Sequence, residues 1–255
     1  MPLIRPFAAL RPAPEHADAV LAPPYDVLSS GEARERTVGK PWSFLHVSKA
    51  EIDLPEDIDP YDASVYAKSA ENFQRMMSQG VLVQDDAPCY YVYRLVMGSH
   101  VQTGIAAAAS VEAYDAERIK KHEFTRPAKE DDRVRQIEAL GAQTGPVFLV
   151  YPANAVVDGI LADVAKGAPD MDVTADSGVQ HTLWVIRDAV QIEAISTAFE
   201  AMDALYVADG HHRSAAASRV AASRKASNPK HSGDELYSYF LSVIFPNGLM
   251  TFGKH

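Results

Sequence analysis

The sequence predicts a mixed α/β fold, in which strands and helices alternate along one chain. Short apolar runs rich in β-branched and aromatic residues, such as Val147–Tyr151, are typical of strands. They alternate with longer segments of helical periodicity, such as Ala189–Met202, and this alternation favours a mixed sheet covered by helices. Hydrophobic residues make up 47% of the 255 positions, which is enough for a substantial core.

Two parts are expected, with a boundary near residue 85. Residues 1–85 are predicted to form a smaller extended and helical subdomain, and residues 86–255 the mixed α/β domain. The prolines of Met1–Ala22 favour an irregular path with at most one short edge strand. The stiff segment Pro23–Val27 is expected to reach the cleft of the larger part. The other elements expected here are a helix from about Ser30, a strand over Trp42–Val47 and a helix over Tyr61–Gln79 that Asp59-Pro60 caps.

The larger part begins with a predicted β-hairpin. Its strands are Cys89–Met97 and Val101–Ser110, and Gly98-Ser-His100 supplies the turn. Helices are then expected over Lys129–Leu140, Val156–Lys166, Ala189–Met202 and Ser214–Ala222, and strands over Val147–Tyr151, His181–Ile186, Ala204–Ala208 and Tyr237–Pro246. Met250–His255 matches no element.

Composition excludes several classes of function. The net charge of −10 argues against general attraction to nucleic acid or to an anionic membrane surface. Cys89 is the single cysteine, so an intrachain disulfide framework and a thiolate-rich metal site are excluded. The sequence has no signal pattern and no apolar run of about 20 residues, so we expect a cytoplasmic protein.

The densest group of reactive side chains follows the predicted strand Ala204–Ala208. A tight turn at Asp209-Gly210 leads into an alanine-rich helix that begins at Ser214. Unpaired N–H groups at a helix N-terminus favour an anion, and an arginine clamps phosphate through two donors. The alternative is a structural turn, in which Asp209 caps the helix and exposed histidines occupy its first turn. Between strand and helix lie His211, His212 and Arg213.

A second charged segment lies before the helix Lys129–Leu140. It joins a His-Glu pair, His122 and Glu123, to a group of cations, which is what a phosphoryl-transfer site needs. A solvated charged loop is the alternative. The cations are Lys120, Lys121, Arg126, Lys129 and Arg133.

A transition-metal site built from Asp209, His211 and His212, with His122 as a further ligand, is a weaker possibility. Adjacent helical residues diverge by about 100° around the axis, so neighbouring histidines rarely face one ion.

Six segments in order carry a resemblance to a known family. They are Arg5–Pro12, Ala22–Val27, Ser43–His46, Lys120–Glu123 with Lys129–Arg133, Gln143–Gly145 and Ala208–Arg213. Together they resemble the domain-of-unknown-function family ten-fifteen, over essentially the whole chain. The resemblance extends to the ParB/sulfiredoxin superfamily, so a ParB/sulfiredoxin-like core is implied. Family members are usually longer, so this chain is expected to be truncated after the strand near Val243.

Three activities are known across the superfamily that the chain resembles. Sulfiredoxin chemistry needs a cysteine where this chain has His211. The DNA clamp of ParB needs a helix-turn-helix segment that the sequence does not suggest. Free-serine kinases of the superfamily carry a turn similar to Asp-Gly-His-x-Arg, which Asp209–Arg213 matches in full. The resemblance therefore implies an ATP- or ADP-dependent kinase of a small hydroxyl metabolite.

The implied kinase activity assigns a role to each candidate residue. Glu123 is the expected base, with His122 as the alternative, and His211 or His212 contacts the transferred phosphoryl group. Asp209 would coordinate Mg²⁺. The expected partners are a nucleotide and a small substrate, and neither nucleic acid nor a membrane is expected. A non-catalytic nucleotide-binding regulatory module is the rival reading. The residues expected to bind the nucleotide are Asp209, Gly210, Arg213, Ser214, Lys120, Lys121, Arg126, Lys129, Arg133 and Thr144.

Overall fold

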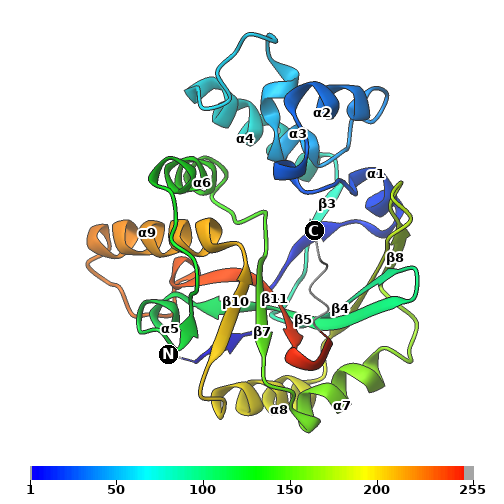
Figure 1. Cartoon of the computed structure of the whole chain (residues 1–255), viewed down its shortest axis with the longest axis vertical. Coiled ribbons are helices and arrows are strands. Elements are labelled where there is room, and N and C mark those ends of the chain that lie inside the picture. The colour runs from blue at the N-terminus through cyan, green and yellow to red at the C-terminus, as the bar shows by residue number, and fades with distance from the viewer. Residues whose placement is uncertain (1, 250–255) are drawn as a thin grey trace.

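The centre of the molecule is a mixed β-sheet (Figure 1). In this computed structural model, which describes residues 2–249, the sheet has nine strands in the order β6-β10-β7-β11-β5-β4-β9-β8, with β1 paired to β5 beside that path. β10 runs parallel to β6 and β11 parallel to β7, whereas the other neighbours are antiparallel. The strands are β1 (Ile4–Arg5), β4 (Tyr90–Met97), β5 (His100–Ser110), β6 (Ile119–Lys120), β7 (Val147–Tyr151), β8 (Met171–Thr174), β9 (Gln180–Ile186), β10 (Leu205–Asp209) and β11 (Tyr239–Pro246).

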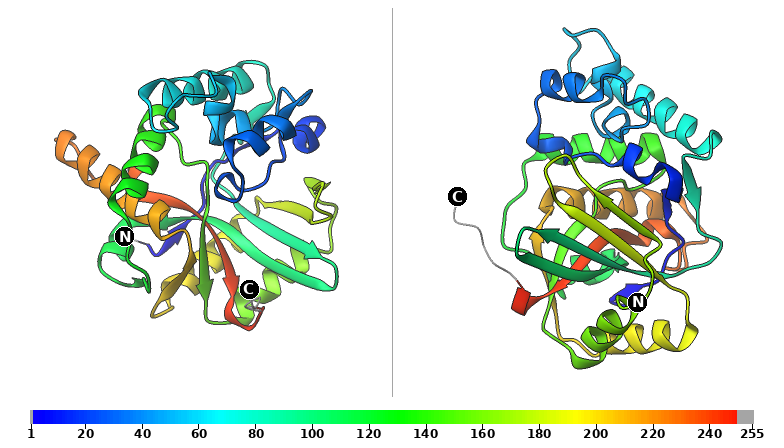
Figure 2. Two further views of the ribbon diagram at one scale, coloured as in Figure 1. Left: turned by 45° about the horizontal axis from the view of Figure 1, so that its top comes forward. Right: turned by 90° about the vertical axis from the view of Figure 1, so that its right-hand side faces the viewer.

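Helices pack around the sheet in layers. At the bottom of Figure 1 lie α7 (Ala155–Val164) and α8 (Ala189–Glu200), and on the other side α9 (His211–Ser227) lies between the sheet and α6 (Pro127–Leu140). The helices of the N-terminal part stand beyond α6 (Figure 2). These are α1 (Ala17–Val20), α2 (Ser30–Thr37), α3 (Leu45–Ser48) and α4 (Ala63–Ser78); the short α5 (Val111–Asp115) follows β5. The α/β class predicted from the sequence is confirmed.

The sheet core and the N-terminal helices bury separate hydrophobic clusters. The largest cluster joins sheet residues such as Ile105 and Leu149 to Phe199 of α8 and Ala217 of α9. A second cluster joins Val47, Phe73 and Met76 to Leu140 at the end of α6. The N-terminal part therefore packs against α6, while its first strand, β1, belongs to the main sheet. The boundary near residue 85 stays a prediction.

The predicted hairpin is confirmed. β4 and β5 pair antiparallel from Tyr91 opposite Ala106 to Met97 opposite His100, around the turn at Gly98. β7, β9, β10 and β11, and the helices α2, α7 and α8, also fall within a few residues of their predicted bounds.

The strand predicted over Trp42–Val47 is wrong, because its last residues form α3. The apolar residues of this segment are buried as expected, but they pack into two different clusters. Leu45 is buried in a cluster with Ala33 and Ile52, while Val47 enters the cluster with Phe73. A helical turn points neighbouring side chains in different directions, so this short segment packs into both clusters as a helix.

Three helix starts differ from their predictions. α4 begins at Ala63 because Asp62, and not Asp59-Pro60, caps it by accepting from the Ser64 N–H at 2.8 Å. α6 begins at Pro127, since proline is tolerated in the first turn of a helix. α9 begins at His211 and ends at Ser227, so the histidines lie in its first turn.

Several short strands were not predicted. The N-terminal segment contains two, β1 and β2 (Leu10–Pro12), and β2 pairs with β3 (Leu82–Gln84) in a small second sheet. β6 and β8 were also missed, because runs of two to four residues carry too little periodicity. Within residues 2–249, no helix has the length and apolar character needed to cross a membrane. Met250–His255, predicted to form no element, lie outside the described residues.

Candidate functional site

The predicted strand–turn–helix unit is present at the end of β10. Gly210 has φ 95°, a left-handed conformation that glycine adopts without strain, and it occupies the N-cap position of α9. A Cβ at this position would lie 3.0 Å from Nε of Arg213. The alternative in which Asp209 caps the helix is wrong, because Asp209 ends β10 and its side chain contacts Arg213 instead.

The Arg213 guanidinium is held by two partners. Its Nη2 donates to Oδ2 of Asp209 at 2.5 Å, and its Nη1 donates to the carbonyl oxygen of Pro146. Gly145 lets the side chain approach, since a Cβ there would lie 3.2 Å from Cδ of Arg213. Gln143 fixes this second turn by accepting from the Leu241 N–H and donating to the Tyr239 carbonyl, both at 3.0 Å. The turn at residues 142–146 is therefore built against Arg213.

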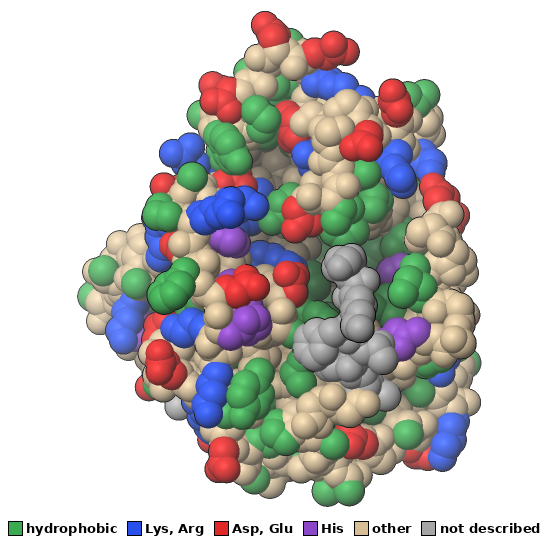
Figure 3. Space-filling model, viewed as in Figure 1, with side chains coloured by type: hydrophobic (Ala, Val, Ile, Leu, Met, Phe, Trp, Pro, Cys, Tyr) green, Lys and Arg blue, Asp and Glu red, His purple; other side chains and the backbone are tan. Residues whose placement is uncertain are grey.

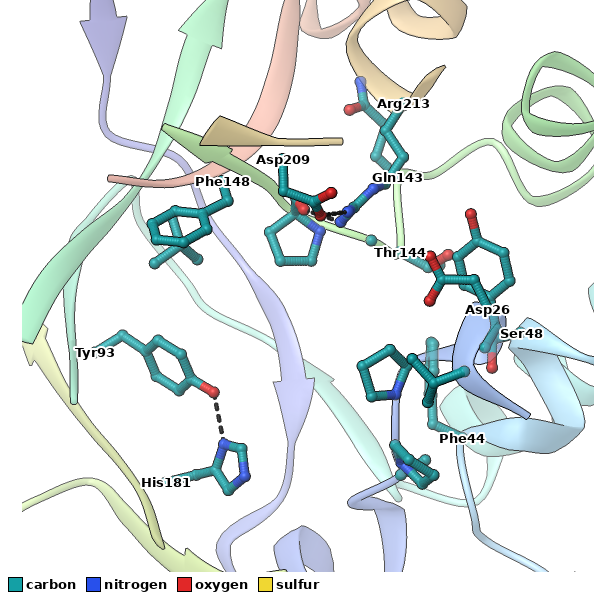
Figure 4. A pocket seen from close by; sticks show the side chains of 18 of the residues that line it. Asp26, Phe44, Ser48, Tyr93, Gln143, Thr144, Phe148, His181, Asp209 and Arg213 are labelled. Atoms are coloured by element: carbon teal, nitrogen blue, oxygen red, sulfur yellow. Dashed lines mark hydrogen bonds and ion pairs between the residues drawn. The ribbon is translucent and has the colours of Figure 1, made fainter. Parts of the chain in front are cut away.

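Arg213 borders a cavity of about 690 Å³ (Figure 4). Besides Arg213 of α9, its walls come from the segment Leu21–Val27, the helices α3 and α6, the turn Gln143–Pro146 and the sheet strands. The prediction that Pro23–Val27 reaches the cleft is confirmed. In Figure 4, Asp26 points from this segment toward Thr144, across the cavity from Asp209.

On the side of the cavity formed by α6, the Arg133 side chain contacts the Tyr25 ring. Arg133 donates twice to Oδ2 of Asp132, at 2.9 and 2.5 Å, and its guanidinium carbon lies 4.2 Å from the centre of the Tyr25 ring. Burial raises the pKa of Tyr25, although the charge of Arg133 opposes that shift. Tyr25 therefore stays a neutral hydroxyl at neutral pH.

The opposite end of the cavity is aromatic. The Tyr93 hydroxyl and Nδ1 of His181 are hydrogen-bonded at 2.6 Å, and the rings of Phe148 and Phe245 lie 5.0 Å apart. Burial raises the pKa of Tyr93 to about 12 and lowers the pKa of His181, so both side chains are neutral near pH 7. Figure 4 shows this pair away from Arg213, so the cavity has a charged end and an aromatic end.

The two charged segments of the sequence lie side by side. β6 pairs in parallel with β10, with Ile119 opposite Leu205, so the residues after β6 run beside the first turn of α9. Nδ1 of His211 lies 3.4 Å from Glu123 Oε2, and Nε2 of His122 lies 3.9 Å from Glu123 Oε1. The rings of His122 and His211 meet edge to face, 4.5 Å apart. None of the three is among the residues that line the cavity.

His211 and His212 point in different directions. His211 is 3% exposed, so the expectation of exposed histidines in this turn fails for it. Burial lowers the pKa of His211, and the neighbouring His122 acts in the same sense. Nε2 of His212 instead accepts a hydrogen bond from the Arg126 N–H at 3.1 Å. Among the described residues, the possible metal ligands grouped with His211 are His122 and Glu123, and His212 is not in that group, so the site considered from His211 and His212 together stays a prediction.

Most of the expected phosphate-binding residues lie outside the cavity. Lys121 sits over the Tyr114 ring at 4.1 Å and Lys120 over the Tyr206 ring at 5.6 Å. Ser214 is fully buried and donates to the His211 carbonyl oxygen at 3.1 Å. Gly210, Arg126 and Lys129 are likewise not lining residues. Those that do line it are Asp209, Arg213, Arg133 and Thr144.

Sequence reasoning missed the aromatic end. Tyr93 lies within the predicted hairpin and His181 at the start of a predicted strand, and both were read only as structural residues. The strand pattern did place Tyr93 and Leu95 on one face of the hairpin, because residues two apart on a strand share a face. Both residues line the cavity. Which face of the hairpin is hollow depends on packing that the local sequence does not encode.

Comparison with known families gives one match. The model of the family described as "Protein of unknown function (DUF1015)" matches residues 4–252. No match was found among curated proteins or among solved structures.

Proposed function

The chain belongs to the DUF1015 family, whose description names no activity, so we propose a function from the cavity. We propose a nucleotide-dependent phosphotransferase that acts on a small hydroxyl metabolite, with free serine as the first candidate. One observation carries this proposal. Arg213, in the first turn of the 17-residue helix α9, borders a cavity of about 690 Å³. That volume is within the range of small-molecule sites, about 300–1,000 Å³.

The charged end suits phosphate groups. A guanidinium donates to two phosphate oxygens at once, and the N-terminus of a helix carries partial positive charge. Arg213 is now paired with one carboxylate, that of Asp209, and a phosphate would offer it a more strongly charged partner. Arg133, on the α6 wall, is the second cation of the cavity among the described residues.

The same exchange would provide a ligand for Mg²⁺. The Asp209 side chain is 70% exposed, and once Arg213 turned to phosphate its oxygens would be available. Carboxylate and phosphate oxygens are the ligands that Mg²⁺ prefers. Bound there, the ion would offset the charge of the transferred phosphoryl group, so the residues present fit a magnesium–nucleotide complex.

The aromatic end suits a nucleobase. Tyr93 and His181 offer neutral rings and two groups able to hydrogen-bond, away from Arg213 in Figure 4, and Phe148, which is opposite Asp209 in the sheet, adds a third ring. Base–aromatic stacking contributes about 1–3 kcal/mol per base in nucleic-acid complexes. This end and the charged end together match a molecule with a flat ring at one end and phosphates at the other.

The base is assigned to Asp26. Phosphoryl transfer to a hydroxyl is assisted by a carboxylate within hydrogen-bond reach of the proton it accepts. Glu123 and His122, which the sequence suggested, are not lining residues, whereas Asp26 lines the cavity and faces the side that holds Asp209. Thr144, beside Asp26, would help to position the acceptor hydroxyl.

A turnover assay with two matched variants tests this assignment. The full chain is incubated with Mg²⁺, ATP or ADP, and a panel of hydroxyl metabolites that includes serine. We expect Asp26→Asn to lower kcat by about 10²–10⁴-fold while nucleotide affinity is kept, and Glu123→Gln to leave kcat nearly unchanged. A large loss of kcat in Glu123→Gln with little change in Asp26→Asn would instead assign the base to Glu123. No turnover with any acceptor, although nucleotide binds, would refute the phosphotransferase.

A non-catalytic nucleotide-binding module, of the ParB-like regulatory type, is the second candidate. It is favoured by the position of the residues expected to be catalytic: His122, Glu123 and His211 contact one another instead of lining the cavity. A module of this kind would bind nucleotide at Arg213 and show no turnover in the assay above.

A further inference from the structure

A cluster of two imidazoles and a carboxylate stands beside the cavity. One potential ligand atom each from His122, Glu123 and His211 lies within 4.8 Å of the others. Histidine side chains lie among acidic and basic side chains on the face shown in Figure 3. From this cluster we propose a binding site for a divalent first-row transition ion such as Zn²⁺, independent of the proposed phosphotransfer.

The separation of His211 and Glu123 matches metal coordination better than hydrogen bonding. Nδ1 of His211 and Oε2 of Glu123 are 3.4 Å apart. An N–H···O hydrogen bond is about 2.7–3.2 Å long, so this pair is too distant for a good one. Two ligands of a tetrahedral zinc ion, each about 2.0–2.1 Å from the metal, lie roughly 3.3 Å apart. The His211–Glu123 pair is already at that separation.

His211 lacks the hydrogen bonds that a buried imidazole needs. Its side chain is 3% exposed, and its Nε2 is buried without a hydrogen-bond partner among the described residues. A buried polar group without partners costs free energy. Nδ1 is the nitrogen that faces Glu123, so it is the atom that would bind the ion, and the proton of the ring would then stay on Nε2.

His122 and Glu123 would complete the site from the solvent side. Their side chains are 58% and 63% exposed, so both can turn without disturbing the core. Nε2 of His122, now 3.9 Å from Glu123 Oε1, needs a small rotation to reach the same ion. Two imidazole nitrogens and one carboxylate oxygen form a ligand set that suits Zn²⁺ and related ions and leaves a position for water.

The site differs from one built on adjacent histidines. Nε2 of His212 accepts a hydrogen bond from the Arg126 N–H and His212 is not a member of the cluster, so the second imidazole comes from the segment after β6. The parallel pairing of β6 with β10 is therefore what assembles this ligand set.

Zinc binding to the tag-free full chain tests the proposal. Metal content after equilibrium dialysis, and affinity from competition with a chelator, are measured for the wild type and for His122→Ala, Glu123→Gln and His212→Ala. We expect one Zn²⁺ per wild-type chain. Affinity should fall at least about tenfold in His122→Ala and in Glu123→Gln, since loss of a ligand costs at least as much as loss of its supporting partner.

His212→Ala is the matched control, because it removes the adjacent imidazole and should leave zinc affinity unchanged. The two ligand variants change exposed side chains, so circular dichroism should show both folded. The proposal is overturned if the wild type binds zinc no better than His122→Ala and Glu123→Gln do, or if His212→Ala weakens binding as much as they do. Neither result depends on nucleotide or turnover.

Discussion

Arg213 is the residue on which the proposed nucleotide site depends. In the structure it bridges Asp209 at the end of β10 and the Pro146 carbonyl of the neighbouring turn. These contacts hold the guanidinium at the cavity edge. The price of binding phosphate would be the loss of the Asp209 ion pair, which is exposed and therefore contributes little to stability.

Replacing Arg213 should weaken nucleotide binding selectively. A hydrogen bond to a charged group contributes about 1.5–3 kcal/mol, so Arg213→Ala should lower the affinity for magnesium–ADP by about 10–100-fold in a calorimetric titration. Arg213→Lys should recover only part of that loss, because lysine lacks the planar pair of donors. Arg219→Ala is the control, since Arg219 lies on the same helix and binds Glu130 and Asp131 outside the cavity. Equal losses in the Arg213→Ala and Arg219→Ala variants would contradict the assignment.

His181 should make folding stability depend on pH. In the unfolded chain it takes up a proton near pH 6.5, whereas burial lowers its pKa in the folded protein. Between these two pKa values the unfolded state binds more protons, so the free energy of unfolding falls as the pH drops below about 6.5. Stability from this group is fully present above that pH.

Urea unfolding at about pH 7.5 and about pH 5.5 checks the effect. The wild type should lose more stability between the two conditions than His181→Gln, which does not titrate there and can still hydrogen-bond Tyr93. Equal losses would mean that His181 is not buried as the structure has it.

At the scale of elements, the β10–α9 turn depends on Gly210. Its φ of 95° disfavours any side chain, and a Cβ would press on the Arg213 guanidinium at 3.0–3.2 Å. Gly210→Ala should lower the free energy of unfolding by about 1–3 kcal/mol and also weaken nucleotide binding, because Arg213 must move. Gly39→Ala is the control: Gly39 has φ 73° with nothing within 4 Å, so it should lose stability alone. Wild-type nucleotide affinity in Gly210→Ala would argue against this role of the turn.

Elements with strong local patterns could be predicted, and elements set by tertiary packing could not. The hairpin of β4 and β5 has long runs of β-branched and aromatic residues around a glycine turn. α3 also contains two buried apolar residues, Leu45 and Val47, but these two face different clusters. β6 has only two residues, Ile119 and Lys120, yet its pairing with β10 decides which side chains meet His211.

The candidate site could be predicted only in part, because part of it depends on tertiary packing. Residues close in sequence, such as Asp209 and Arg213, could be assigned to one turn, and the Pro23–Val27 segment was correctly expected at the cleft. Whether Glu123 faces the cavity or His211 depends on the path of the chain after β6. Tyr93 and His181 join the cavity only because β4 and β9 are neighbours in the sheet.

At the scale of the whole molecule, the cavity lies where segments far apart in the sequence converge. The N-terminal segment supplies Asp26, the sheet supplies the aromatic end, and the β10–α9 turn supplies Arg213. The N-terminal helices are tied to α6 by Gln136, whose amide donates to the Val47 carbonyl at 3.1 Å and to Ser69 Oγ at 2.7 Å. In the proposed function, one wall would carry the base while the opposite wall would hold phosphate.

Phosphoryl transfer in this cavity can be followed directly by ³¹P NMR of the protein with Mg²⁺, ATP or ADP, and serine. A new phosphomonoester signal should grow with time in the wild type and be nearly abolished in both Arg213→Ala and Asp26→Asn. A nucleotide spectrum that stays unchanged over the same time, for serine and for every other hydroxyl metabolite tested, would contradict it.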